Sequence, residues 1–175
     1  MVEELGGAGK KEALCHCAVS CDNGRRVVTL TTKKSTNSTY INFWGKGALS
    51  VVTKPITYVD KTLEKLNCLE ISTDKSLLFG AGENALGGCL VAFSNDKYFD
   101  YVCKEEFADE PVAAVKKLSN SDILIVGAKT RLSIMHYEGG HFSMLRNFSN
   151  IFSEGRIISL DYFGKEIVAL NENGN

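Results

Sequence analysis

One pattern of residues recurs four times along the chain, and this repetition restricts the fold more than any other feature. Each copy has an apolar residue, two intervening residues, a second apolar residue, a turn and then a run of strand-forming residues. The copies start at Leu14, Leu66, Val112 and Ile157, so the starts are 52, 46 and 45 residues apart. Self-similarity at a period near this length indicates an array of repeated structural units.

The second copy shows the pattern most clearly. Residues 66–71 lead into the turn 72–75, and the run 76–82 follows. Such runs are short, rich in Val, Ile, Thr, Phe and Tyr, and separated by Gly, Asn, Asp and Ser, which favours strands over helices. Two more strand-like stretches follow each of the first three copies, so we expect three four-stranded sets and a final pair. These stretches are 39–44 with 49–52, 89–93 with 98–102, and 132–137 with 141–145.

The repeats resemble those of the WD40-repeat family. Residues 66–80 are similar to that family's inner strand and the turn after it, and Trp44 ends a third strand where the family usually has Trp-Asp. The resemblance covers residues 13–175 and implies an all-β fold: a β-propeller of four-stranded antiparallel blades, with about three and a half blades in an incomplete ring. Gly45 replaces the Asp, so the family's buried Asp-His-Ser/Thr-Trp network is not expected intact.

The repeat also divides the chain. Closed propellers typically have about 4–8 blades, and Asn173-Gly174 is a hairpin-turn signal after which a third strand would begin. We therefore expect that the natural chain continues or that another copy or partner completes the array. The expected parts are a flexible leader at 1–12, blades at 13–65, 66–111 and 112–156, and two strands of a fourth blade at 157–175.

Charge and hydropathy limit the classes of partner. The 20 Lys and Arg residues nearly balance the 21 Asp and Glu residues, so no clustered basic face for nucleic acid is expected. No stretch approaches the roughly 20 apolar residues of a membrane helix, and the first residues lack a signal-peptide pattern. We expect a cytoplasmic protein without membrane insertion, with cytoskeletal association as an option, and reduced thiols at all six cysteines.

Three motifs point towards chemistry, and each lacks an essential part. Gly6–Lys11 is similar to a phosphate-binding loop but lacks its first glycine and its Ser or Thr. Cys15-His16-Cys17 with Cys21 offers metal ligands without a second ligand pair. His136 and His141 flank a turn, but no Cys or cluster of Asp and Glu residues accompanies them, which indicates surface residues. With no nucleophile motif either, we expect no enzyme activity, no metal and no cofactor.

The resemblance to WD40 proteins implies that partners bind at two kinds of connection, those between second and third strands and those between blades. The connection after the first blade combines apolar anchors with charges, which suits a protein interface. The alternative is an ordinary solvated loop with Tyr58 packed on the blade. The candidate partner-binding residues are Lys33, Lys34, Lys54, Ile56, Tyr58, Asp60, Lys129 and Arg131.

We therefore expect a non-catalytic protein–protein interaction scaffold, a subunit or fragment of a larger assembly. Its partners would be other proteins, among them a chain that completes the propeller. Two alternatives remain. A hydrolase-type enzyme could use a propeller pocket, and polar groups converging on the axial ends of the first strands would favour it. A purely structural component of a large cytoskeletal or ciliary complex would instead have exposed apolar edge strands.

Overall fold

The computed structural model describes residues 13–21, 25–45, 51–108, 110–118 and 120–174. The expected leader at 1–12, with its loop-like Gly6–Lys11, lies outside these residues. The described chain consists of strands and one short 3-10 helix, η2 (Ile56–Tyr58). No helix in this part of the chain is long and apolar enough to cross a membrane.

The strands form four antiparallel sheets, which we call the first to fourth blades. The first contains β1 (Ala13–Cys21), β2 (Arg26–Lys33), β3 (Ser38–Gly45) and β4 (Val52–Pro55). The second contains β5 (Leu63–Ile71), β6 (Leu77–Asn84), β7 (Gly87–Ser94) and β8 (Tyr101–Ala108). The third contains β9 (Val112–Lys117), β10 (Ile123–Ala128), β11 (Arg131–Glu138) and β12 (His141–Phe148). The fourth contains β13 (Ile157–Phe163) and β14 (Glu166–Asn171).

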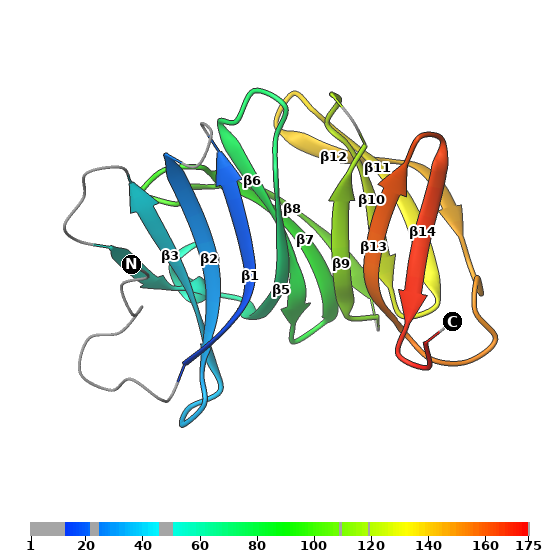
Figure 1. The fold of residues 1–175 in the computed structure, drawn as a ribbon, viewed down its shortest axis with the longest axis horizontal. Helices are drawn as coiled ribbons and strands as arrows, with labels where there is room; N and C mark the ends of the chain where they lie inside the picture. Colours follow the sequence, from blue (N-terminus) through cyan, green and yellow to red (C-terminus); the bar gives the residue numbers. More distant parts are fainter. Residues whose placement is uncertain (1–12, 22–24, 46–50, 109, 119, 175) are drawn as a thin grey trace.

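The first strands of the four blades lie side by side in chain order. β1 packs against β5, β5 against β9, and β9 against β13, and Figure 1 shows these four strands next to one another across the view. Each blade continues outward from its first strand in sequence order. The tandem all-β arrangement expected from the repeat is thus confirmed, as an open arc of three complete blades and a two-stranded sheet.

Apolar layers join successive blades because side chains alternate between the two faces of a strand. Leu78 and Phe79 are neighbours on β6, yet Leu78 packs in the layer shared with the first blade and Phe79 in the layer shared with the third. On β10, Leu124 and Ile125 divide in the same way between the second and fourth blades. A second strand therefore reads as a continuous apolar run, because both of its faces are covered.

Strand positions differ from the prediction in the outer part of the blades. β4 spans 52–55, and residues 49 and 50 of the stretch expected at 49–52 lie outside the described part of the chain. β8 spans 101–108 rather than 98–102. In the second blade a turn occupies the predicted start of the strand: the Asp96 carboxylate accepts hydrogen bonds from the Tyr98 N–H at 2.7 Å and from the Ser94 hydroxyl at 2.9 Å. Phe99 then turns inward with φ 56° and is fully buried. β5 starts at Leu63, three residues ahead of the expected boundary between blades.

Candidate functional site

Each first strand contains a residue that is left out of the strand pairing at the same position of the repeat, and β5 has a second one, Glu64, near its start. The pairing passes from Cys15 to Cys17 in β1, from Leu66 to Cys68 in β5, from Val112 to Ala114 in β9 and from Ile157 to Ser159 in β13. These are β-bulges, which redirect a side chain and often occur beside binding sites. The four bulged residues, at equivalent positions of the repeat, are His16, Asn67, Ala113 and Ile158.

All four bulged side chains line one hollow of about 320 Å³. It opens at the end of the blades where the first strands begin, which also carries the connections between blades at 56–62, 110–111 and 149–156. We call this end the connection face and the opposite end, with the turns after the first strands, the hairpin face. Four strands far apart in the sequence thus bring their bulged residues to a single site.

Two of the bulged side chains also hold neighbouring inner strands together. His16 Nε2 donates to the backbone carbonyl oxygen of Leu66 at 3.2 Å, and its Nδ1 lies 3.4 Å from the Thr32 hydroxyl. Asn67 Nδ2 donates to the carbonyl oxygen of Val112 at 2.8 Å. The accepting residues, Leu66 and Val112, each directly precede the bulged residue of the next first strand. The first blade is therefore joined to the second in the same way as the second is joined to the third.

Charged groups surround the hollow. Lys65 Nζ lies 3.9 Å from Glu83 Oε1, which also accepts a hydrogen bond from Asn67 Nδ2 at 3.2 Å. Arg156 lies on the side of the fourth blade, where its Nε is 3.1 Å from Glu172 Oε2, and its side chain is 63% exposed. The hollow therefore has cationic, anionic and apolar walls at once.

A second hollow of about 440 Å³ adjoins the first and shares Pro111 and Arg156 with it. Lys129 and Thr130, in the turn between β10 and β11, form another part of its wall. Of the predicted residues, Lys129 thus belongs to this extended site. Arg131 lies beside it and pairs with Glu110 of the connection between the second and third blades, with Nε and Oε2 3.3 Å apart.

The predicted residues of the first blade lie in several places. Lys33 and Lys34 are exposed at the end of β2. Lys54 belongs to β4 rather than to a loop, and its ammonium group lies 3.6 Å from the centroid of the Tyr58 ring. Tyr58 is 55% exposed, so its ring remains accessible beside that cation. Ile56 is buried among the core residues of the first layer and is not a surface anchor, because η2 turns its side chain inward.

Asp60 takes part in an ion-pair network that the sequence did not reveal. Lys104 Nζ of β8 lies 2.9 Å from both Asp60 Oδ2 and Glu106 Oε1, and donates to the Thr62 hydroxyl at 2.7 Å. Burial raises the pKa of Asp60, but hydrogen bonds from Thr62 and Lys104 outweigh it, so this pKa is lowered. Burial by itself would lower the pKa of Lys104, but the hydrogen bonds and charges of Glu106 and Asp60 outweigh burial, so this pKa is raised. The network ties β8 to the connection before β5.

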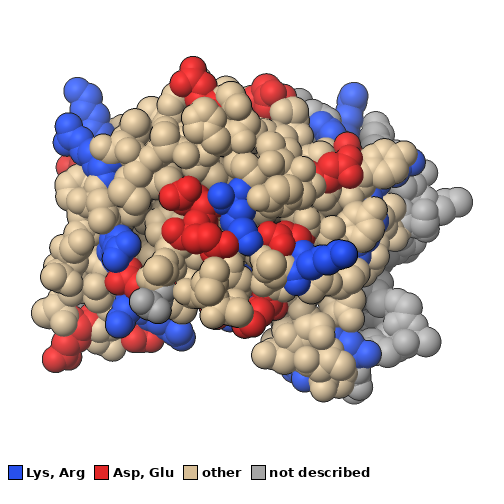
Figure 2. All heavy atoms as spheres, turned by 180° about the vertical axis from the view of Figure 1, so that it is seen from behind, with Lys and Arg blue, Asp and Glu red and all other residues tan. Residues whose placement is uncertain are grey.

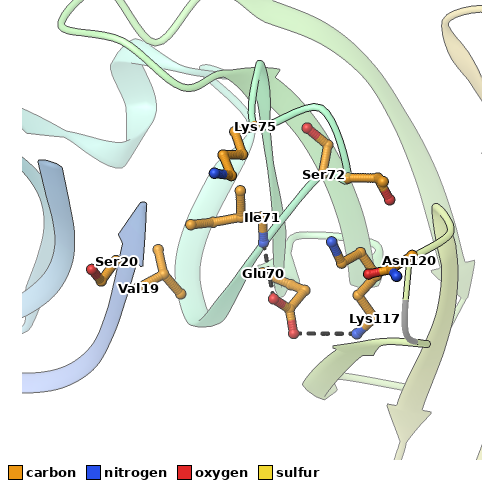
Figure 3. Close-up of a pocket in the computed structure, with 9 residues that line it drawn as sticks. Val19, Ser20, Glu70, Ile71, Ser72, Lys75, Lys117 and Asn120 are labelled. Carbon is orange, nitrogen blue, oxygen red and sulfur yellow. Dashed lines mark hydrogen bonds between the residues drawn. The ribbon is translucent and has the colours of Figure 1, made fainter. Parts of the chain in front are cut away.

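A third hollow, of about 360 Å³, lies on the hairpin face between the ends of β1, β5 and β9. Figure 3 shows Lys75 on one side of it and Lys117 with Asn120 on the other. The Glu70 carboxylate between them accepts hydrogen bonds from the backbone N–H groups of Ile71 at 3.0 Å and Lys117 at 3.2 Å. This carboxylate therefore connects the ends of two inner strands.

The cysteines of the inner strands accept hydrogen bonds from backbone groups. The Leu69 N–H donates to Cys17 Sγ at 3.3 Å, and the Val115 N–H donates to Cys68 Sγ at 3.0 Å. Burial raises the pKa of both thiols, that of Cys68 to about 12.

Among the described residues, no group of three or more His, Cys, Asp or Glu side chains could hold a metal ion. The side chain of Cys21, the fourth ligand considered, lies outside this description.

Trp44 retains part of the network that the resemblance implied. Its Nε1 donates to the Thr29 hydroxyl at 3.2 Å, which is the Thr–Trp contact of that network. Asn42, opposite Thr29 on the next strand, donates to the hydroxyls of Thr29 at 3.2 Å and Thr31 at 3.1 Å, and accepts from Thr53 at 2.9 Å. The outward face of the first blade is therefore closed by polar groups that satisfy one another.

The reverse side of the molecule carries acidic and basic side chains close together, without a field of one sign (Figure 2). Such a surface does not favour polyanions, which bind to clustered Lys and Arg. This face thus agrees with the balanced composition.

Comparisons with known proteins support the fold. No protein-family model matches the chain, and no curated protein matches it either. Among solved structures, the Dos1 propeller superposes with a TM-score of 0.63 at 9% identity, covering 85% of this chain and 36% of that one. The propeller domain of Cps50 (Swd1) from Myceliophteria thermophila gives 0.63 at 7% identity, covering 91% and 67%. A "putative 6-phosphogluconolactonase" from Bacteroides uniformis gives 0.62 at 14% identity, covering 94% and 49%.

The chain spans 36% of the Dos1 structure, 49% of the Bacteroides uniformis protein and 67% of the Swd1 domain. Identities this low show the fold alone. Together with the four tandem antiparallel sheets, these similarities show that the chain has a β-propeller fold built from blades like those of WD40 domains.

Proposed function

We propose that this chain is a non-catalytic scaffold that binds other proteins through its connection face, as a subunit of a larger cytoplasmic assembly. The observation that carries this proposal is the pair of adjoining hollows to which all four blades contribute. Among the partners we include a chain that completes the propeller.

The walls of the two hollows suit a protein segment. Ala113 and Ile158 offer apolar contact, Lys65 and Arg156 offer cations, and Glu83 offers an anion within one opening. Protein interfaces combine a few apolar anchors with a polar rim in this way. His16 and Asn67 donate hydrogen bonds to backbone carbonyls, so their side chains shape the floor of the site.

The test compares two charge-reversed variants in quantitative capture from native extract. The first carries Arg156→Glu and Lys129→Glu on the connection face. The matched control carries Lys75→Glu and Arg25→Glu on the hairpin face, with the same change in net charge and with Lys75 and Lys129 both at positive φ. We expect the first variant to capture at least tenfold less of most partner proteins than the unmodified chain does. The control should capture the same amounts as the unmodified chain. Equal capture by both variants would refute the connection face as the binding surface.

A second candidate function is that of a hydrolase-type enzyme that uses the first hollow, the one lined by the four bulged residues. His16, Lys65 and Glu83 lie together in its wall, which is the convergence of polar groups that would favour catalysis. One structurally similar protein bears the name of a 6-phosphogluconolactonase. Incubation of the chain with 6-phosphogluconolactone tests this candidate: turnover that Glu83→Gln abolishes would establish it, and hydrolysis at the uncatalysed rate would remove it.

A further inference from the structure

We propose that the seam between the outer parts of the first and second blades is a second protein-binding surface, which takes an acidic segment of a partner protein. We call it the tyrosine surface, and its residues are Lys54, Tyr58, Lys97, Tyr98 and Tyr101. The inference goes beyond the proposed function, because none of these residues lines the two hollows of the connection face. Both blades that form the surface are complete four-stranded sheets.

A lysine that crosses from the first blade to the second holds the tyrosine surface together. Lys54 Nζ on β4 donates to the backbone carbonyl oxygen of Tyr98 at 3.2 Å and lies 3.6 Å from the centroid of the Tyr58 ring. Lys97 Nζ lies 5.1 Å from the centroid of the Tyr98 ring. Aromatic faces stabilise both cations. Because an ammonium group has three N–H donors, these contacts leave donors of both lysines for an acceptor on a partner.

Nearby carboxylates do not neutralise these two lysines. Among the residues that the structure describes, neither Lys54 nor Lys97 forms an ion pair with an Asp or Glu side chain. Asp96, next to Lys97 in the sequence, instead accepts hydrogen bonds within its own turn, from the Tyr98 N–H at 2.7 Å among others. Asp100 is exposed, so one carboxylate of this turn stands against two ammonium groups. The balance of charge therefore favours an acidic partner.

Three tyrosine rings give the surface its contact area. Tyr58 is 55%, Tyr98 53% and Tyr101 49% exposed. Tyr101 faces the first blade, because it lies opposite Phe93, whose side chain packs in the layer that the two blades share. Burial and the charge of Asp60 raise the pKa of Tyr101, so its hydroxyl keeps the proton that it can donate to a carboxylate. Tyrosine is enriched at protein interfaces, since its ring buries apolar area while its hydroxyl forms a hydrogen bond.

The composition of this surface suits a protein segment better than a polyanion. Nucleic acid binds where many Lys and Arg residues cluster, and here two lysines lie among three tyrosines. An acidic segment can place carboxylates beside Lys54 and Lys97 and apolar side chains on the tyrosine rings, which is the combination of anchors and polar rim that protein interfaces have. The partner should therefore carry Asp or Glu residues close to apolar or aromatic ones.

Selection from a library of random peptides tests this chemistry. Peptides that bind the immobilised full chain are collected, and those that also bind the chain with Tyr58→Ser and Tyr98→Ser are removed. We expect the remaining peptides to be enriched in Asp and Glu together with apolar or aromatic residues. Enrichment in Lys and Arg, or no enrichment over the starting library, would overturn the inference.

Titration of a selected acidic peptide measures the contribution of the two cations. Lys54→Met with Lys97→Met should weaken binding at least tenfold, and binding to the unmodified chain should weaken as the salt concentration rises, because salt screens exposed charges. The control is Lys116→Met with Lys165→Met, which removes the same positive charge from the third and fourth blades. This control should bind the peptide as tightly as the unmodified chain does.

The outcomes separate this inference from the proposed function. Equal binding by the Lys54–Lys97 variant and its control would overturn the tyrosine surface, whereas charge reversal at the connection face still decides the scaffold. Concentration-dependent dimers that the same variant abolishes would also overturn it, because they identify a second copy of the chain as the occupant. Near-ultraviolet circular dichroism checks that each variant is folded. Should the double variant unfold, Lys97→Met alone, at an exposed position, carries the comparison.

Discussion

The sulfur of Cys68 accepts a hydrogen bond from the backbone N–H of Val115, 3.0 Å away on the next inner strand. Cys17 makes the same contact with Leu69 at 3.3 Å. Both cysteines directly follow a bulged residue, His16 or Asn67, whose side chain donates to the same neighbouring strand. Two adjacent side chains therefore connect the first blade to the second, and two more connect the second to the third.

These thiols should react slowly with alkylating reagents. Burial raises the pKa of Cys68 to about 12, and burial together with the nearby Glu106 raises that of Cys89 to about 12. The thiolate is the reactive form, and with a pKa about four units above pH 8 only about one molecule in 10⁴ carries it. We expect iodoacetamide at pH 8 to modify the exposed Cys15 first. Peptide mass spectrometry over time checks the order, and early labelling of Cys68 would contradict it.

The fourth blade should open more readily than the others. Ala113 and Ala114 stand where Asn67 and Cys68 stand in the second blade, and methyl groups cannot make the side-chain hydrogen bonds to the next strand. We expect amides of residues 157–171 to exchange at least tenfold faster than those of β5 and β6 in the free chain, since local opening has a lower free energy there. Hydrogen exchange with mass spectrometry measures this, and uniform protection across all four blades would refute it.

Two glycines on β6 should differ sharply in their tolerance of alanine. A Cβ atom at Gly82 would overlap the carbonyl oxygen of Lys65, a backbone atom of the paired strand. At Gly80 it would lie 3.1 Å from Cδ2 of Leu66 and Cγ1 of Val91, which are side-chain ends able to shift. We expect Gly80→Ala to cost about 1–3 kcal/mol of unfolding free energy and Gly82→Ala more than about 4 kcal/mol. Urea denaturation compares the two, and equal costs would argue against this close approach of β5 to β6.

The Lys104 network should contribute stability over a defined pH range. The pKa of Asp60 is lowered from 3.8, so its contribution is present above that pH and is lost as pH falls through the folded-state pKa. The pKa of Lys104 is raised from 10.5, so its contribution is present below that pH and is lost as pH rises through the folded-state value. We expect Lys104→Met to cost about 1–3 kcal/mol at pH 7.

Chemical denaturation at pH 7 and pH 3 measures this effect. The difference between Lys104→Met and the unmodified chain should shrink at pH 3, because below pH 3.8 the unfolded chain takes up a proton at Asp60 more readily than the folded network does. Lys116→Met provides the control, because Lys116 forms an exposed pair with Asp161 at 3.5 Å. Its loss should have little effect on stability, because solvent screens an exposed ion pair. A cost for Lys104→Met as small as that of the control would show that the network does not stabilise the fold.

The sequence predicted the tandem sheets because apolar periodicity and turn residues act locally. The turn 72–75 and the apolar run after it are enough to place β5 and β6. The outer strands were predicted less well, since β8 starts where the Asp96 turn ends, and the hydrogen bonds of that turn are not visible in a hydrophobic pattern.

The sequence by itself determined that strands repeat, how many there are in each set, and that no charge excess directs the chain to polyanions. Only the tertiary structure decided which residues meet. Bulges at His16, Asn67, Ala113 and Ile158 depend on pairing between strands, and their convergence on one hollow depends on the packing of four blades around an axis. Burial of Ile56 and the pairing of Asp60 with Lys104, 44 residues away, likewise depend on contacts between distant segments, which local patterns do not encode.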